Sequence, residues 1–243
     1  MTEGTPWKVI LRFSIPVLMG NLFQQLYNLA DAMIIGRLVG VYPLAGVGAA
    51  AAMSFLVLGF ATGLTGGFSV VTAQRAGQGD PEKIEESAAA SMVLCAVTAV
   101  LLTVLSVATA VPLLRFMNTP KEIFPYARTY IRITYLGLGA VLYYNLMAGL
   151  LRALGDSRTP LYFLIISSVL NVVLDVIMIR GFHGGVGGAA LATVISQLVS
   201  AVACHLYAVK RYPVLRPEKR YLKVECREAF AHLRIGVCLL YTS

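Results

Sequence analysis

The sequence predicts an all-α, polytopic membrane protein built as a bundle of six transmembrane helices. Of its 243 residues, 58% are hydrophobic and only 13% are charged, whereas soluble domains carry about 25% charged residues. The apolar residues form long blocks rather than the amphipathic stripes of a soluble helical protein. A helix crosses the hydrocarbon with about 20 apolar residues, and six blocks reach that length. They cover residues 9–38, 44–73, 87–114, 126–151, 159–179 and 187–209.

The connections between these blocks have the residues that end one helix and begin the next. Gly, Asp and Pro occur together in residues 77–81 and again in residues 155–160, as expected for helix boundaries. Asp80 is expected to cap a helix that begins at Pro81, because proline in the first turn needs no donor.

The distribution of Lys and Arg predicts the orientation in the membrane. Basic residues are more frequent on the side that holds the amino terminus, and cytoplasmic loops carry such an excess. We therefore expect a multi-pass protein of the cell membrane with a cytoplasmic amino terminus. The expected cytoplasmic set is Lys8, Arg12, Arg75, Lys83, Arg152, Arg158, Lys210, Arg211, Arg216, Lys219, Arg220 and Lys223, against Arg37, Arg115, Lys121, Arg128 and Arg180 outside.

Other classes of protein are not indicated. The net charge of +8 is spread over short stretches between apolar blocks, so a nucleic-acid-binding face is not expected. The four cysteines contain no CxxC pair, and the histidines are not spaced as metal ligands beside them. No metal site is therefore expected beyond a coupling ion. No catalytic motif of a hydrolase is visible, so we predict that the chain is not an enzyme.

Two acids lie inside the apolar blocks, Asp31 in the first and Asp175 in the fifth. An ionisable side chain within the bilayer costs free energy and is a functional candidate by default. Both blocks run outward, and Asp31 precedes Arg37 by six residues while Asp175 precedes Arg180 by five. At about 1.5 Å per residue the two carboxyl groups fall at nearly the same depth in the outer half of the membrane. They are expected to face one cavity.

Each acid continues a row of amides. Asn21, Gln24 and Asn28 precede Asp31 at helical spacing, and Asn171 lies one turn before Asp175, so each set is expected on one helix face. Amide and carboxylate oxygens can ligate Na⁺, and such a carboxyl can exchange a proton. Interhelical hydrogen bonding without ion coupling, or an acid that reaches the outer interface, stays an alternative.

Pro16 lies about four turns before Asp31 and removes one backbone hydrogen bond of its helix. It is expected either to act as a hinge or to form a static kink. Two glycine-rich runs have no phosphate-binding context. Residues 63–67 are expected to allow close helix packing, and residues 184–188 to form a tight outer turn before the sixth helix.

An internal echo suggests a second unit. Leu11-Arg12 opens the first apolar run, and Leu233-Arg234 opens a similar run near the end. Membrane transporters are commonly built from such repeats. We expect an amino-terminal six-helix lobe over residues 1–212, then a cytoplasmic linker and the truncated start of a second lobe over residues 213–243.

Several ordered motifs resemble the multidrug and toxic compound extrusion (MATE) family of transporters. Ile15-Pro16, Asn21 through Asn28, Asp31 and Ile35-Gly36-Arg37 are similar to its first helix. Residues 77–80 and 152–160 are similar to its loops after the second helix and before the fifth, and 171–175 and 188–193 to its fifth and sixth helices. The resemblance runs from about residue 6 to 237, after which residues 238–243 no longer follow the family pattern.

The resemblance implies one lobe of a twelve-helix antiporter that expels small organic, cationic compounds in exchange for Na⁺ or H⁺. It requires no cofactor besides the coupling ion. The family's cation site would map onto Asp31, Asn171, Asp175, Tyr130 and Thr193, and bending at its proline favours Pro16 as a hinge. The expected partners are these substrates, membrane lipids and a second six-helix lobe. Because alternating access uses two lobes, this half-length chain alone is expected to be inactive.

Two alternatives remain open. A lipid-linked oligosaccharide flippase of a related superfamily is expected to have cationic residues in its cavity, whereas the cavity charges predicted here are acidic. A non-transporting membrane scaffold is expected to bury both aspartates in dry packing between helices.

Overall fold

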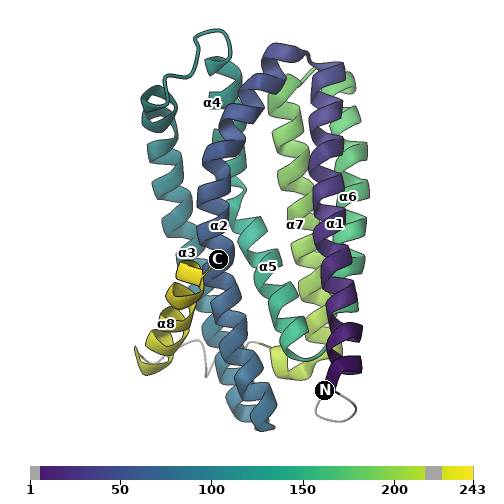
Figure 1. Cartoon of the computed structure of the whole chain (residues 1–243), viewed down its shortest axis with the longest axis vertical. Helices are drawn as coiled ribbons and strands as arrows, with labels where there is room; N and C mark the ends of the chain where they lie inside the picture. Colours follow the sequence, from purple (N-terminus) through teal and green to yellow (C-terminus); the bar gives the residue numbers. More distant parts are fainter. Residues whose placement is uncertain (1–5, 217–225, 243) are drawn as a thin grey trace.

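Helices make up the part of the chain that the computed structural model describes, residues 6–216 and 226–242 (Figure 1). The longer elements are α1 (Pro6–Leu38), α2 (Val41–Gln78), α3 (Pro81–Phe116), α4 (Phe124–Leu136), α5 (Leu138–Ala153), α6 (Arg158–Val176), α7 (Gly185–Arg211) and α8 (Cys226–Thr242). A π-helical turn, η1 (Ile177–Gly181), extends α6, and a short 3₁₀ turn, η2 (Pro213–Leu215), follows α7.

All six predicted apolar blocks are helical, but the fourth is broken. α4 and α5 meet at Gly137 and are bent by 47°. A Cβ atom at Gly137 would lie 2.2 Å from Val194 Cγ2, so glycine lets α7 approach the break. Among the described helices, α2, α3, α6 with η1, and α7 are each long and apolar enough to span a membrane, and the bent pair is a fifth such span. α1 does not qualify by composition, because its polar residues lower its hydropathy.

The helices run up and down along one long axis, with α1, α6 and α7 on one side and α2, α3 and α4 on the other (Figure 1). α1 packs on α6, α6 packs on α7, and α7 contacts α4 and α5. The amino terminus, the α2–α3 turn, the α5–α6 turn and the end of α7 share one end of the bundle (Figure 1). This alternation matches the predicted topology, whereas the side that faces the cytoplasm stays a prediction.

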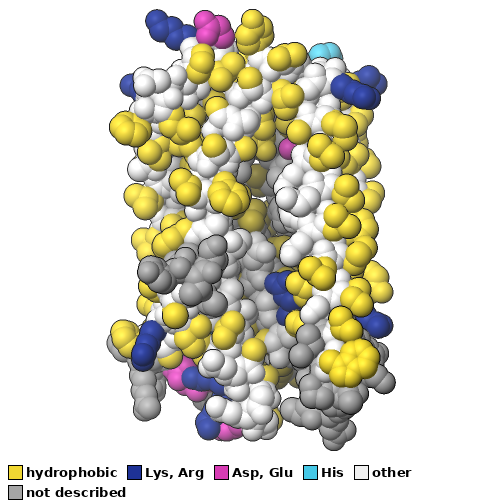
Figure 2. Space-filling view, in the orientation of Figure 1, with side chains coloured by type: hydrophobic (Ala, Val, Ile, Leu, Met, Phe, Trp, Pro, Cys, Tyr) yellow, Lys and Arg dark blue, Asp and Glu magenta, His cyan; other side chains and the backbone are white. Residues whose placement is uncertain are grey.

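Large apolar side chains cover the outside of the bundle (Figure 2). Leu18, Phe55, Leu56, Val100 and Leu101 are all more than half exposed. Water would strongly disfavour so continuous an apolar surface, so we assign it to lipid. The main internal cluster includes Phe68, Leu146 and Leu150, and it packs the two sides of the bundle together.

The predicted turn residues have the expected roles. Asp80 caps α3, since its side chain accepts a hydrogen bond of 3.2 Å from the backbone N–H of Glu82. Asp156 accepts hydrogen bonds from the backbone N–H groups of Arg158 and Thr159 at the start of α6. The second glycine run does form a turn into α7, where Gly185 has a φ of +52°.

Helix α8 packs against α2 and α3. Gly67, from the first glycine run, confirms the predicted close packing: a Cβ atom there would lie 2.2 Å from Gly236 Cα. Arg75 forms ion pairs with Glu86 and Glu228. The proposed division at residue 212 stays a prediction, and Lys219, Arg220 and Lys223 of the expected linker lie outside the described residues.

The contact between α2 and α5 generates a test of this packing. A Cβ atom at Gly149 would lie 2.7 Å from Ser69 Cβ, whereas one at Gly139 of the same helix would lie 3.8 Å from its nearest neighbour, Ala99 Cβ. We expect Gly149→Ala to destabilise the fold by about 1–3 kcal/mol through overpacking. Gly139→Ala should be neutral or stabilising by up to about 1 kcal/mol, because alanine favours helix. Unfolding of both variants in detergent measures the difference, and equal stability would contradict the packing.

Candidate cation site

The structure brings Asp31 and Asp175 together. α1 packs along α6, and the two carboxyl groups are close enough to interact electrostatically. Asp31 is 8% exposed and Asp175 is fully buried. One oxygen of each, Oδ1, has no hydrogen-bond partner among the described residues. Two carboxylates in contact repel each other unless a proton or a cation lies between them.

Asn171 links Asp175 to α7. The amide is best oriented with its nitrogen toward the carboxylate, where it donates to Asp175 Oδ2 at 3.0 Å. Its oxygen then faces the hydroxyl and the backbone N–H of Thr193, at 3.2 and 3.3 Å. The opposite orientation would place two acceptor oxygens against each other. Asn171 is fully buried, so this orientation satisfies an amide that water cannot reach.

Two tyrosines complete the surroundings of the carboxyl pair. The Tyr27 hydroxyl lies within hydrogen-bonding reach of Thr193, and Tyr130 of α4 lies within electrostatic range of both aspartates. The predicted set of Asp31, Asn171, Asp175, Tyr130 and Thr193 therefore gathers in one place. Whether it binds an ion stays a prediction.

The predicted row of polar residues on α1 is wrong in part. Asn28 is exposed, and its side chain donates to Gln25 at 3.3 Å. Tyr27, one turn before Asp31, is buried instead. A helix turns by about 100° per residue, so Asn28 and Tyr27, three and four residues before Asp31, flank the Asp31 side chain on its two sides around the helix axis. The sequence contained this signal at Tyr27, but the amide pattern concealed it.

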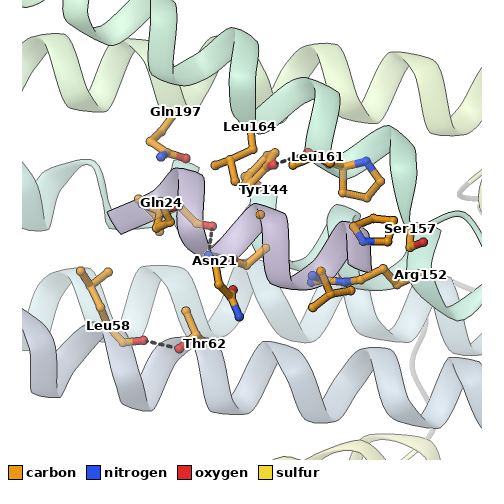
Figure 3. Close-up of a pocket in the computed structure, with 16 residues that line it drawn as sticks. Asn21, Gln24, Leu58, Thr62, Tyr144, Arg152, Ser157, Leu161, Leu164 and Gln197 are labelled. Atoms are coloured by element: carbon orange, nitrogen blue, oxygen red, sulfur yellow. Dashed lines mark hydrogen bonds between the residues drawn. The ribbon is translucent and has the colours of Figure 1, made fainter. Parts of the chain in front are cut away.

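Asn21 and Gln24, the rest of that row, line a separate cavity of about 300 Å³ (Figure 3). α1, α2, α5, α6 and α7 all contribute to its wall. Arg152, at the end of α5, is the one charged residue among the described residues that line it. This cavity contains neither aspartate, so the expectation of acidic charges, which concerned the surroundings of Asp31 and Asp175, stays a prediction.

Pro16 also lines this cavity and is buried within α1. α1 is one continuous helix through this position. Because proline has no N–H, one backbone hydrogen bond of α1 is missing here. The structure thus places the proline beside the cavity, while its action as a hinge stays a prediction.

The chemistry of the site suits a small hard cation or a proton. No group of three or more His, Cys, Asp or Glu side chains that could hold a metal occurs in residues 6–216 and 226–242. Two carboxyl groups and nearby hydroxyl oxygens are present here, while the Asn171 amide oxygen accepts from Thr193. Hard cations prefer such oxygen ligands, so these residues fit Na⁺ or H⁺ better than a transition metal.

Comparisons with known proteins find a family and several similar chains. Residues 16–177 match the MatE family model. The "Probable multidrug resistance protein YoeA" of Bacillus subtilis is 31% identical, over 97% of this chain and 52% of its own length. The chain therefore spans about half the length of the curated relatives it matches.

Solved structures are similar over the same half. A MOP superfamily transporter from Pyrococcus furiosus, described as having a binding pocket of reverse polarity that suggests a different function, has a TM-score of 0.90 at 31% identity. The match covers 98% of this chain and 53% of that one. A MATE crystal structure in the bent conformation has a TM-score of 0.89 at 32% identity, with 98% and 53% covered.

The contacts of Asn171 generate a second test. Asn171→Leu keeps the approximate side-chain volume but leaves Asp175 and Thr193 without their buried partner, so we expect a loss of about 1–3 kcal/mol in stability. Asn28→Leu is the matched control, because Asn28 is exposed on α1 and its loss should change stability by less than about 0.5 kcal/mol. Thermal unfolding in detergent measures both. Equal losses would contradict the placement of Asn171.

Proposed function

Because the chain belongs to the MATE family of multidrug transporters, we propose that it forms the amino-terminal lobe of a secondary exporter driven by Na⁺ or H⁺ antiport. It is a multi-pass membrane protein, and the contact between the carboxyl groups of Asp31 and Asp175 carries the proposal. Burying two ionised acids together without a counter-charge is costly. A cation or proton between them removes that cost.

The coupling follows from this energy difference. With a cation or proton bound, α1 and α6 pack as in the structure. When it leaves, the repulsion between Asp31 and Asp175 favours an arrangement in which the two helices separate or the carboxyl groups become hydrated. A ligand can shift such an equilibrium only by its differential affinity for the two states. Substrate would bind in the second state and leave in the first.

Pro16 provides a site for that movement. Two similar solved structures are described as MATE in the bent and in the straight conformation, which supports the proposal that this chain also changes conformation. In this chain, the missing backbone hydrogen bond at Pro16 and its position at the cavity wall make it the proposed hinge. The part of α1 that carries Asp31 would then move relative to α6.

The substrates, partners and location are part of the proposal. Curated relatives are described as multidrug resistance or export proteins, which supports small organic, cationic substrates. Because alternating access uses two lobes about a shared site, residues 1–212 would work with a second six-helix lobe and not alone. The excess of basic residues at the amino-terminal end supports a cytoplasmic amino terminus in the cell membrane.

Each alternative receives one supporting observation: the arginine in the cavity favours the flippase, and the burial of both aspartates between helices favours the scaffold. A single arginine is less than a pyrophosphate-binding surface requires, so the exporter remains the proposed function. The proximity of the two buried acids is a costly arrangement for a scaffold, since neutral side chains would pack there without that cost.

Neutralising either acid tests the exporter. In a full-length protein, Asp31→Asn or Asp175→Asn should abolish ion-driven drug efflux while the protein remains in the membrane, because neither variant can exchange the coupling ion. Glu122→Gln, an exposed acid in the turn before α4, should retain full efflux. Efflux from vesicles energised by either a Na⁺ or a proton gradient measures the effect and identifies the ion. Normal efflux in both aspartate variants would eliminate the coupling role.

A further inference from the structure

Arg152 has an unusual position for a basic residue near the end of a membrane helix. Its side chain lies at the cavity wall, beside Ser157 and to the right of Asn21 in the view of Figure 3. In the part of the chain that the structure describes, the ion pairs are Arg75 with Glu86 and Glu228, and Lys83 with Asp80. Arg152 is in none of them.

The acid nearest in sequence is already used. Asp156 accepts hydrogen bonds from the backbone N–H groups of Arg158 and Thr159, and from the Thr159 hydroxyl at 2.6 Å. The buried Tyr144 hydroxyl beside the cavity donates to the Pro160 carbonyl at 2.9 Å. Neither group forms an ion pair with the guanidinium, and the half-buried Arg152 faces the cavity without a counter-charge among the described residues.

The rest of the polar wall consists of amides. Asn21 and Gln24 come from α1, Asn145 from α5 and Gln197 from α7, and the Gln197 side chain is 8% exposed. Amide groups can donate to an anion without adding charge of their own. Leu58, Leu161 and Leu164 form apolar wall next to them. The Arg152 guanidinium, the neutral amide donors and the apolar wall could together bind an amphipathic molecule with an anionic end.

The cavity is distinct from the aspartate pair. Gln24 is the last α1 residue in its wall, and Asp31 lies seven residues further, about 10 Å along the helix. Figure 2 shows a furrow between the two sides of the bundle, with a basic side chain visible in its lower half and an acidic one higher up. The cavity wall on α1 and Asp31 therefore lie at different depths along that helix.

We propose that this cavity binds the anionic head group, a phosphate or carboxylate, of an amphipathic ligand through Arg152. Guanidinium binds such groups with two parallel hydrogen bonds, and Gln24, Asn145 and Gln197 supply the neutral contacts. The cavity of about 300 Å³ suits a head group with the start of an apolar chain. The inference goes beyond cation-coupled export, which requires no anion site.

Binding of dodecyl phosphate and of dodecyltrimethylammonium to the full-length protein tests the proposal by calorimetry in a non-ionic detergent. Arg152→Gln should weaken dodecyl phosphate binding at least tenfold and leave dodecyltrimethylammonium binding unchanged. Arg158→Gln, an exposed arginine at the same end of the bundle, should change neither. Inorganic phosphate distinguishes the sources: binding of phosphate alone indicates a free anion, and binding of dodecyl phosphate only indicates a lipid or other amphiphile.

Three results would overturn the proposal. The wild type could fail to bind both phosphate probes, as it would if an acid of the second lobe neutralises Arg152. Arg152→Gln could bind dodecyl phosphate like the wild type, or Arg158→Gln could lose as much. Should Arg152→Gln misfold, Gln197→Leu and Gln24→Leu decide: a selective loss for dodecyl phosphate supports the site, and unchanged binding in both rejects it. Because binding is measured without transport, this failure is separate from failure of the exporter proposal.

Discussion

Two carboxyl groups, one from α1 and one from α6, meet where apolar side chains surround them, and their mutual repulsion is the constraint on the rest of the lobe. The two acids meet because α1 packs along α6 and both helices run in the same direction. This arrangement places Asp31 and Asp175 at one depth. Asn171 then ties Asp175 to Thr193 of α7. Three helices thus depend on the charge state of one pair, so loading and unloading a cation can alter the packing among all of them.

Much of this arrangement follows from the sequence. Asp31 precedes Arg37 by six residues and Asp175 precedes Arg180 by five, which predicts nearly equal depth in parallel helices. The structure brings the two aspartates together. Contacts between residues far apart in the sequence cannot be predicted in this way. The break at Gly137 depends on how closely Val194 comes, and no local pattern shows that contact. The amide spacing predicts Asn28 beside Asp31, but Tyr27 lies there instead. Residues three and four positions before Asp31 are equally close to it on a helix, so spacing alone does not distinguish them.

The cavity around Arg152 is a second feature that the sequence alone does not predict. From the sequence, Arg152 is one of the basic residues near the helix ends that predict the orientation of the protein in the membrane. Only the folded arrangement of α1, α5 and α7 turns it into the wall of a cavity with amide neighbours. α1 contributes to both features, since Pro16 and Gln24 line the cavity and Asp31 belongs to the acid pair. Movement of this one helix would therefore change both sites together.

The distance between the two acids is the quantity on which the account rests most directly. In a full-length protein without native cysteines, Asp31→Cys combined with Asp175→Cys should be cross-linked rapidly in membranes by a bifunctional thiosulfonate with a short spacer. The pair Asn28→Cys with Asp175→Cys should react far more slowly, because Asn28 is exposed on another side of α1. Equal rates for the two pairs, or no cross-link between positions 31 and 175, would contradict the meeting of the two acids.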